Sequence, residues 1–480
     1  MKVKLKKFTE FSRSLLPNEA KYLASLESNI TDFEKNQILK KLINNAVSED
    51  ETEKFDVSID KRKYTYIKTW IERKLSDIDV DRAIVSLLNL RRKILTDSID
   101  YQEEVEFLRY LSNYEGIEYY FQNLYELAKE YQSYLLIRMR YKDHEIVNSF
   151  LSDYESHYNK AKLIHDRLYQ ATGEITSQYT LNDKETKYWE KWLIKVFRTK
   201  SIDGKNRYKA FVLLTFMYTN YNEKGKLASI FDEIDLFFSQ GEMYSRRLLS
   251  NYYANRVLMH SKNNDLKKAE YYGFLSIRQR NDDTLMYLNN LVAITLRNKK
   301  VDLSCSLLDE YQDLFDSTHN NHHRIGYISY KVRALAGLER FEEAESLAKN
   351  FLKTNREEVL NHRWHHFFTS YINVLILQEK YYDVLKLTRI YDLKARENFR
   401  RKKSNYVPNI SWSISLARYM EGEINSSRLL VEIKEPINTI NPTSNQKYLM
   451  VQVINTLSNN LPDAFLNLKS HLEQKECLLQ

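Results

Sequence analysis

The stretch Ala334-Leu-Ala-Gly-Leu-Glu-Arg-Phe-Glu-Glu-Ala344 decides the fold class of the second half of this chain. Apolar residues recur at steps of three and four on both sides of a short polar turn, and Leu347 and Phe351 continue the series. This spacing places apolar side chains on one face of a helix. The stretch therefore predicts two helices joined by a turn, with the small residue Ala344 in the first turn of the second helix.

Related segments recur along the second half of the chain. A small residue or a valine marks the start of the second helix in each, at Ala228, Ala269, Ser304, Ala344, Val384, Ser427 and Ala464. The spacings are 41, 35, 40, 40, 43 and 37 residues. A helix pair buries its apolar face only by stacking on its neighbours, so a quasi-regular period of this length predicts an α-solenoid of about seven helix pairs.

The unit that ends at Ala344 resembles the tetratricopeptide repeat (TPR) family, and the resemblance covers residues 207–472. The repeat length differs from the roughly 34 residues of that family, so we describe the repeats as TPR-like. The resemblance implies an all-α superhelix whose first helices line a concave groove. It also implies that the groove holds a peptide or a segment of another protein.

Residues 1–200 are also helical in pattern, but they show no fixed period. In residues 116–140, for example, one apolar stripe steps by three and four along a single long helix, through Ile117, Phe121, Leu124, Ala128, Tyr131 and Leu135. We expect an irregular helical domain over residues 1–200. The polar, glycine-containing segment at 199–206 is the expected boundary with the repeat domain of residues 207–472.

Composition excludes several classes of protein. The chain has nine glycines and five prolines in 480 residues, far fewer than the turns of an all-β or collagen-like protein require. Apolar residues make up 43% of the chain, which is enough to bury a core. The expected fold class is therefore all-α.

Charge and cysteine content suggest where the protein works. The net charge of +8 is mild for this length, and Cys305 and Cys477 are the only cysteines, which is typical of a reducing compartment. No signal peptide or membrane-spanning apolar run is apparent, the longest apolar run lying at residues 211–218. We expect a soluble cytoplasmic protein that does not associate with membranes.

The common catalytic motifs are missing from the sequence. There is no glycine-rich phosphate loop, no His-Glu-x-x-His, no Gly-x-Ser-x-Gly and no Cys-x-x-Cys. The nine glycines of the chain are scattered, so they do not form the glycine-rich loop whose backbone N–H groups bind phosphate. We therefore expect a protein that is not an enzyme and that needs no cofactor.

Six of the eleven histidines lie between His319 and His366. His322 and His362 are 40 residues apart, equal to the local repeat, and His365 and His366 follow the latter on the same helix. A Zn²⁺ ion bridged by His322, His362, His365 and His366 is one interpretation. The preferred interpretation is a polar helix surface that holds no metal.

A basic run spans residues 394–403, with positive charges at Lys394, Arg396, Arg400, Arg401, Lys402 and Lys403. Such a run attracts a phosphate backbone through counterion release. The alternative function is therefore that of a nucleic-acid-associated accessory protein. A charged loop between repeats is more often simply solvated, so this function ranks second.

The preferred function is a scaffold, adaptor or regulator that binds a protein or peptide in the groove. Its candidate contacts occupy matching positions on the expected first helices, at Asn255, Arg256, Asn290, Tyr330 and Lys331. Amides suit the backbone of an extended peptide, tyrosine adds apolar area with a polar tip, and arginine forks onto carboxylates. The sequence leaves the oligomeric state open.

Overall fold

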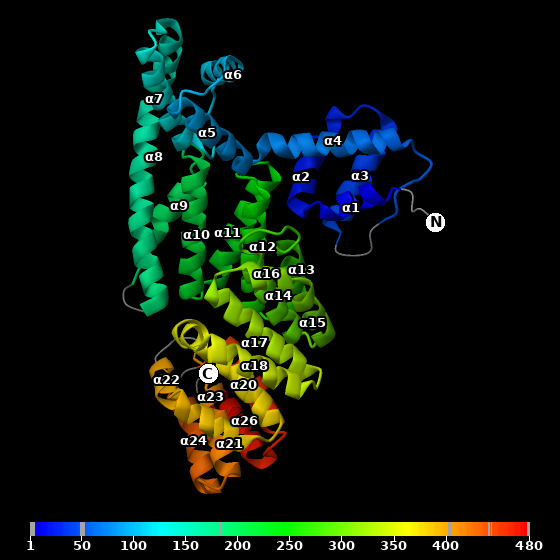
Figure 1. Cartoon of the computed structure of the whole chain (residues 1–480), viewed down its shortest axis with the longest axis vertical. Coiled ribbons are helices and arrows are strands. Elements are labelled where there is room, and N and C mark those ends of the chain that lie inside the picture. Colours follow the sequence, from blue (N-terminus) through cyan, green and yellow to red (C-terminus); the bar gives the residue numbers. More distant parts are fainter. Residues whose placement is uncertain are drawn as a thin grey trace. The chain divides into compact units, whose positions relative to one another are not determined.

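The computed structural model describes residues 5–48, 53–181, 185–401, 406–439, 442 and 444–477. Every regular element in these ranges is a helix, and no strand occurs in them (Figure 1). This confirms the all-α class that the shortage of glycine and proline predicts. None of the described helices has both the length and the apolar composition that crossing a membrane requires.

The chain divides into two compact units, Met1–Tyr252 and Tyr253–Gln480. The division lies inside helix α12 (Arg246–Lys262). Residues 199–203, in the segment where we expected a boundary, connect two helices within the first unit, α9 (Glu190–Arg198) and α10 (Gly204–Asn220). These two helices pack against each other, and the buried side chain of Asp203 accepts a hydrogen bond from the backbone N–H of Asn206 (3.0 Å).

The first unit begins with α1 (Lys6–Ser14), α2 (Pro17–Ser25), α3 (Phe33–Val47) and α4 (Lys61–Ile78), which pack on one another. Aspartates begin several helices of this unit. Asp32, Asp60, Asp79 and Asp100 each accept a hydrogen bond from a backbone N–H in the first turn that follows. A cap of this kind stabilises its helix by about 1 kcal/mol.

A buried carboxylate attaches α2 to the end of the first unit. Glu19 is fully buried and accepts hydrogen bonds from the Tyr244 hydroxyl (2.6 Å), from Arg246 Nε (2.6 Å) and from the backbone N–H of Leu16 (2.8 Å). Because a buried charge is costly unless it is paired and hydrogen-bonded, these partners fix where α2 packs.

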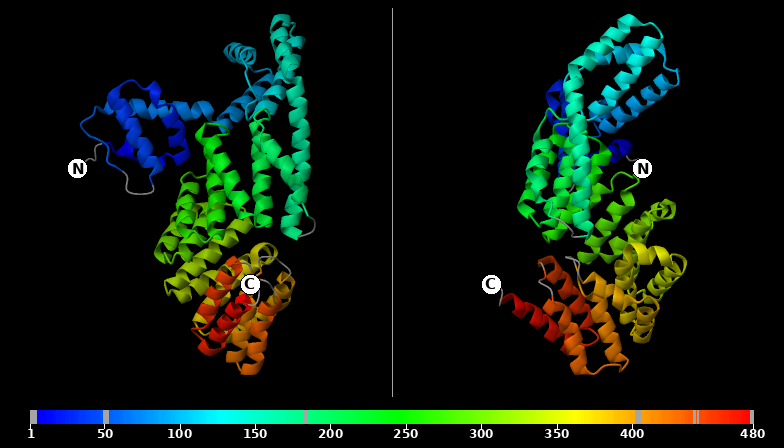
Figure 2. Two further views of the ribbon diagram at one scale, coloured as in Figure 1. Left: turned by 180° about the vertical axis from the view of Figure 1, so that it is seen from behind. Right: turned by 90° about the vertical axis from the view of Figure 1, so that its left-hand side faces the viewer.

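The rest of the first unit is built around a long helix. After α5 (Val80–Leu95) and α6 (Tyr101–Ser112), the antiparallel helices α7 (Phe121–Ile137) and α8 (Tyr141–Leu181) stand side by side (Figures 1 and 2). Five of the six residues of the predicted stripe lie in α7 and are buried, whereas Ile117 precedes the helix and is half-buried. Rings from α7 and α8 stack between them, with Tyr125 and Tyr158 centroids 4.2 Å apart. Helix α11 (Lys224–Ser239) packs on α10 and α2.

The second unit continues from α12 with helices of 6 to 17 residues. They are α13 (Leu266–Ser276), α14 (Thr284–Arg297), α15 (Val301–Glu310), α16 (Gln312–Ser317), α17 (Asn321–Gly337), α18 (Phe341–Thr354), α20 (Trp364–Leu377), α21 (Tyr381–Ile390), α22 (Leu393–Arg400), α23 (Asn409–Met420), α24 (Ser426–Thr439), α25 (Ser444–Leu457) and α26 (Pro462–Cys477). Two short helical segments, α19 (Arg356–Glu358) and η3 (Val359–Arg363), precede α20.

The same turn precedes six of the seven residues that mark the expected repeats, and it also occurs at Asp97, Met139 and Gly241 in the first unit. Its central residue has a left-handed backbone, with φ between 54° and 73°, at Asn222, Asn264, Lys299, Glu339, Glu379 and Gly422. In each turn the following N–H bonds to a carbonyl five residues earlier, at 2.8 to 3.0 Å, as Arg340 N–H does to Leu335. This is the Schellman arrangement that satisfies the free carbonyls at a helix end. Only one of the six central residues is glycine.

The small residues that mark the expected repeats lie near the start of the helix that follows each turn. Ala269, Ser304, Ala344 and Val384 are completely buried, so each allows its helix to approach a neighbour closely. Ala228 and Ala464 are half-buried, and Ser427 is exposed. The close-packing role that the sequence suggests therefore applies to the four central positions.

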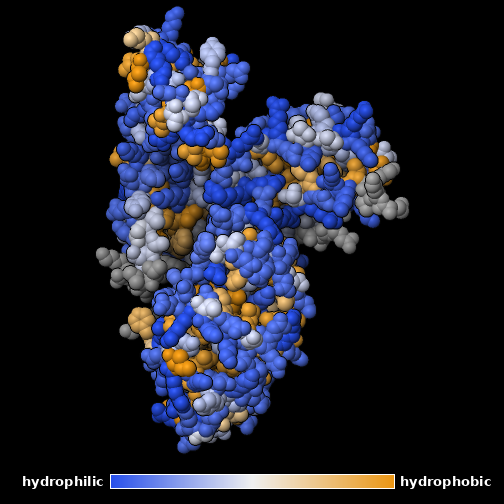
Figure 3. Space-filling model, viewed as in Figure 1, coloured by the Kyte–Doolittle hydropathy of each residue, from blue (hydrophilic) through white to orange (hydrophobic). Residues whose placement is uncertain are grey.

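The helices of the second unit pack in a regular order. Helices α14, α17, α20, α23 and α25 each contact the next one of this series, while α15, α18 and α21 pack on the α14-series helix that follows them. The core between them includes Tyr327 and Trp412, both fully buried, and the indole of Trp412 donates a hydrogen bond to the Ile433 carbonyl (2.8 Å). Hydrophilic residues cover most of this unit's surface in the view of Figure 3.

Candidate functional site: a histidine and arginine cluster on α17 and α20

The five candidate groove residues lie on α12, α14 and α17, and they have different surroundings. Asn255 and Asn290 are half-buried. Arg256 is buried, with its guanidinium 5.6 Å from the centre of the Tyr272 ring. Lys331 turns toward α15 and α16, where it pairs with Asp309 (3.0 Å) and donates to Gln312 (3.2 Å). Tyr330 turns toward α20 instead, where the polar cluster described next is found.

We call this set of side chains the α17–α20 cluster. It consists of His322, Gly326, Tyr330 and Arg333 from α17, together with Arg363 at the end of η3 and His366 in the first turn of α20. The four residues of α17 are spaced by four, four and three positions, which places them on one helix face. Because α17 and α20 pack against each other, this face meets the residues that begin α20.

Tyr330 connects the two helices. Its ring stands edge-on to the imidazole of His366 with the ring centres 4.7 Å apart, and the Arg333 guanidinium lies 5.9 Å from the centre of the same Tyr330 ring. Nε2 of His366 is buried and has no hydrogen-bond partner among the described residues. A buried imidazole nitrogen without a partner is unusual and marks a place where a ligand or water would be stabilised.

A glycine makes room for Arg363. A β-carbon at Gly326 would lie 2.5 Å from a guanidinium nitrogen of Arg363 and 2.9 Å from the amide nitrogen of Asn289. The guanidinium therefore rests directly on the backbone of α17, where its Nη1 donates a long hydrogen bond to the His322 carbonyl (3.5 Å). The Asn289 amide donates to the next carbonyl, that of His323 (3.0 Å).

An irregular turn presents Arg363 to this surface. Residues Val359–Arg363 form a π-helical turn, and Arg363 leaves the helical conformation with φ −136° and ψ 38°. A π turn places an extra residue in the helix and shifts the direction of its side chains, and such turns are frequent at functional sites.

The electrostatics of the cluster are dominated by its two arginines. Burial, reinforced by Arg363 and by the neighbouring histidines, lowers the pKa of His322 to about 4. Burial, followed by Arg363 and Arg333, lowers the pKa of His366 well below its usual range. Both imidazoles are therefore neutral at pH 7, while the two guanidinium groups are charged.

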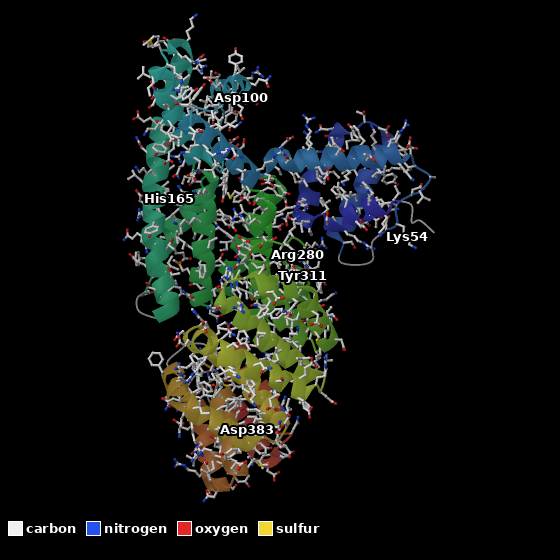
Figure 4. The ribbon with its side chains drawn as sticks, in the orientation of Figure 1. Lys54, Asp100, His165, Arg280, Tyr311 and Asp383 are labelled. Carbon is white, nitrogen blue, oxygen red and sulfur yellow. The ribbon has the colours of Figure 1, made fainter. Side chains whose placement is uncertain are left out.

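The two arginines differ from six arginines of the second unit that form ion pairs with carboxylates. Arg280 pairs with Asp313 at 2.5 Å and lies beside Tyr311 (Figure 4), and Arg389 pairs with Glu423 at 2.9 Å. Arg333 and Arg363 form no ion pair within the described part of the chain. The carboxylate of Asp283 acts on His323 at the edge of the cluster, and Arg363 acts on the same histidine.

The four histidines considered as metal ligands do not converge. His365 faces the buried carboxylate of Glu397, with Nε2 and Oε2 3.4 Å apart, while His366 packs on Tyr330 and His362 is exposed. Within the described ranges, no group of three or more His, Cys, Asp or Glu side chains is arranged to hold a metal ion.

The basic run around α22 is used partly within the fold. Arg396 donates to the carbonyls of Tyr391 (3.2 Å) and Leu360 (3.4 Å), and Arg401 pairs with Glu435 (2.6 Å). Arg400 is half-buried, and burial lowers its pKa. Lys394 is exposed, and Lys402 and Lys403 lie outside the described residues.

The sequence pattern singles out Tyr330 as a groove contact and His322 and His366 as possible metal ligands, but it does not single out Gly326, Arg333 or Arg363. A glycine inside a predicted helix of a glycine-poor chain was the available signal, because such a glycine usually marks a close approach. Comparisons with protein-family models, with curated proteins and with solved structures found no match.

Proposed function

We propose that this chain is a non-catalytic binding protein of the cytoplasm, a scaffold, adaptor or regulator, that holds a peptide or a segment of another protein. In this proposal an irregular N-terminal helical domain precedes a TPR-like superhelix of about seven helix pairs. Two observations support the layout: a turn of one type precedes six of the seven residues that mark the repeats, and four of these residues are completely buried.

The packing order suggests which surface would bind the partner. Helices α14, α17, α20, α23 and α25 pack on one another in series, whereas α15 and α18 each pack on the next α14-series helix. In a curved stack, the helices that stay in mutual contact belong to the inner layer. The α14-series helices would therefore line the concave face, where solenoid proteins hold extended segments.

One observation carries the proposal: the α17–α20 cluster. Its side chains lie on the α14-series row, and the two arginines have no acidic partner among the described residues. Asn290 lies on the preceding helix of the same row and, within the described part, makes no side-chain hydrogen bond. Polar groups that the fold does not use are available to a partner.

The test is affinity capture of partners from nuclease-treated native extract, with the wild-type chain and two variants. One variant combines Asn290→Ala with Tyr330→Phe, which removes an amide and a hydroxyl but keeps the Tyr330 ring against His366. The control combines Ser346→Ala with Lys349→Ala on α18, outside the α14 series.

We expect a stoichiometric protein that wild type and the α18 control retain and that the Asn290→Ala/Tyr330→Phe variant loses. Equal retention by all three chains would contradict the proposed surface. If only nuclease-sensitive partners were recovered, the nucleic-acid alternative would replace the proposal.

A further inference from the structure

The α17–α20 cluster carries a concentrated positive charge in a unit where six other arginines form ion pairs with carboxylates. Arg333 and Arg363 come from different helices, yet both are close enough to His366 to lower its pKa. Two guanidinium groups that both act on His366 and form no ion pair with a carboxylate of the described residues attract an anion.

The neighbouring groups provide hydrogen-bond donors of the right kind. The imidazoles of His322 and His366 are neutral, so each carries one N–H that can donate, and Nε2 of His366 has no partner among the described residues. Tyr330 is a buried residue whose ring lies beside both Arg333 and His366, and its hydroxyl is a further donor. Neutral donors next to charged ones suit an oxyanion with several acceptor oxygens.

The number of charges distinguishes among the oxyanions. A single carboxylate is matched by one arginine, and a phosphodiester carries one negative charge. A phosphate monoester has about −1.5 to −2 charges at pH 7 and three acceptor oxygens. Two arginines and neutral N–H donors match that group best.

We infer that the α17–α20 cluster binds a phosphate monoester, carried on a side chain of the partner segment. This inference rests on the proposed function, because it names the chemistry of the segment that the α14-series row would hold. Arg363, seated on Gly326, and Arg333, beside Tyr330, contact the phosphate from two sides. His322 and His366 donate to its remaining oxygens.

The test measures binding of short probes to the full chain by calorimetry at 150 mM salt. The probes are acetyl-Gly-phosphoserine-Gly-amide, the same peptide with serine or glutamate at the central position, and a thymidine dinucleotide as the phosphodiester. We expect the phosphoserine peptide to bind and the other three to bind at least about tenfold more weakly, because they offer fewer charges and oxygens.

The variants Arg363→Gln and Arg333→Gln each remove one charge and are expected to weaken phosphoserine-peptide binding about tenfold or more, since hydrogen bonds between charged groups are the strong ones. Arg389→Gln is the matched control, because it removes one exposed arginine of the same unit. It is expected to leave binding within about twofold of wild type.

Gly326→Ala is an independent variant that keeps both arginines. The new methyl group would lie 2.5 Å from a guanidinium nitrogen of Arg363 and 2.9 Å from the amide nitrogen of Asn289, so both side chains must shift, and binding is expected to fall while helix content is kept. Gly225→Ala is its control, because nothing lies within 4 Å of a β-carbon at that helical position.

Equal binding of the phosphoserine and serine peptides, or phosphoserine binding that Arg363→Gln, Arg333→Gln and Gly326→Ala leave unchanged, would overturn the inference. Preference for the dinucleotide would also overturn it. A protein partner that Asn290→Ala/Tyr330→Phe releases but Arg363→Gln retains would leave the proposed function standing and reject the phosphate site alone.

Discussion

At the scale of single residues, the left-handed turns are the most informative feature. Glutamate occupies the left-handed position at residue 339, with φ 61°, and asparagine, lysine or glutamate occupies four others. An L-residue other than glycine pays a conformational cost of about 1 kcal/mol there. The turn is therefore present in these helix pairs although the left-handed conformation costs conformational free energy.

Two substitutions by glycine, at Glu339 in the turn and at Glu342 after it, are predicted to change stability in opposite directions. Glu339→Gly is expected to stabilise the α17–α18 pair by about 0.5–1 kcal/mol, because glycine adopts the left-handed conformation without strain. Glu342→Gly, three residues later inside α18, is expected to destabilise it by about 1 kcal/mol. Amide hydrogen exchange of α17 and α18 measures both effects, and equal signs would contradict the role of the turn.

Single residues also show why the site is hard to predict from sequence. Tyr330 and Lys331 are adjacent, and both were expected in the groove. Lys331 turns to Asp309 on α15, whereas Tyr330 meets His366 on α20. Their directions depend on which helices pack on either side of α17, and a helical repeat pattern alone does not specify these neighbours.

At the scale of helices, small residues determine how closely neighbours pack. Ala344 is completely buried at the start of α18, whereas Ser427 at the matching position of α24 is exposed. Ala344→Leu is expected to destabilise the chain by about 1–3 kcal/mol through overpacking. Ser427→Leu is expected to change stability by less than about 0.5 kcal/mol.

Thermal unfolding followed by circular dichroism compares the two variants. A Ser427→Leu chain that melts as early as the Ala344→Leu chain would show that burial does not explain the difference. The comparison therefore tests the packing role at one position where the structure supports it and at one where it does not.

Ion pairs connect successive helix pairs at matching places. Glu270 on α13 pairs with Lys300 (2.5 Å) and accepts from Asn298 (2.6 Å), and Glu345 on α18 pairs with Lys380 (2.6 Å) and accepts from Gln378 (3.0 Å). In each case the amide and the lysine belong to the turn after the next α14-series helix. Burial works against ionisation of Glu345, but its partners outweigh burial and lower its pKa.

The lowered pKa of Glu345 predicts a pH dependence of stability. A carboxyl group with a lower pKa in the folded state stabilises the fold above its ordinary pKa of 4.5 and loses this contribution as the pH falls through the folded-state value. Glu345→Gln should therefore melt earlier than wild type at pH 7, and the gap should narrow at pH 3.5. Glu342→Gln, on the exposed face of α18, is the control and should show no such narrowing.

At the scale of the whole molecule, the chain has two compact units, so a substitution in one unit is expected to affect mainly the stability of that unit. Glu19→Ala leaves Arg246 and Tyr244 without their buried partner, which costs about 3–5 kcal/mol when one half of a buried pair is removed. We expect faster amide exchange within Met1–Tyr252 and little change in Tyr253–Gln480. Glu10→Ala, which removes an exposed pair with Lys6, should change neither unit.

The sequence by itself determined the helical class and the positions of many helix starts. Scarce glycine and proline leave few turns for a sheet, and apolar spacing of three and four residues specifies a buried helix face locally, as the stripe in α7 shows. These are short-range properties that neighbouring residues carry. The expected function, which is to bind a partner without catalysis and without a cofactor, stays a prediction.

Only the tertiary structure decided which side chains meet. Gly326 and Arg363 are 37 residues apart, and they come together because α17 packs on α20 and a π-helical turn changes the direction of Arg363. The sequence shows that the run from Lys394 to Arg401 is basic. It does not show that Arg396 donates a hydrogen bond to a backbone carbonyl or that Arg401 forms an ion pair with Glu435. Contacts between distant residues depend on helix packing and local irregularities, which a periodic pattern does not encode.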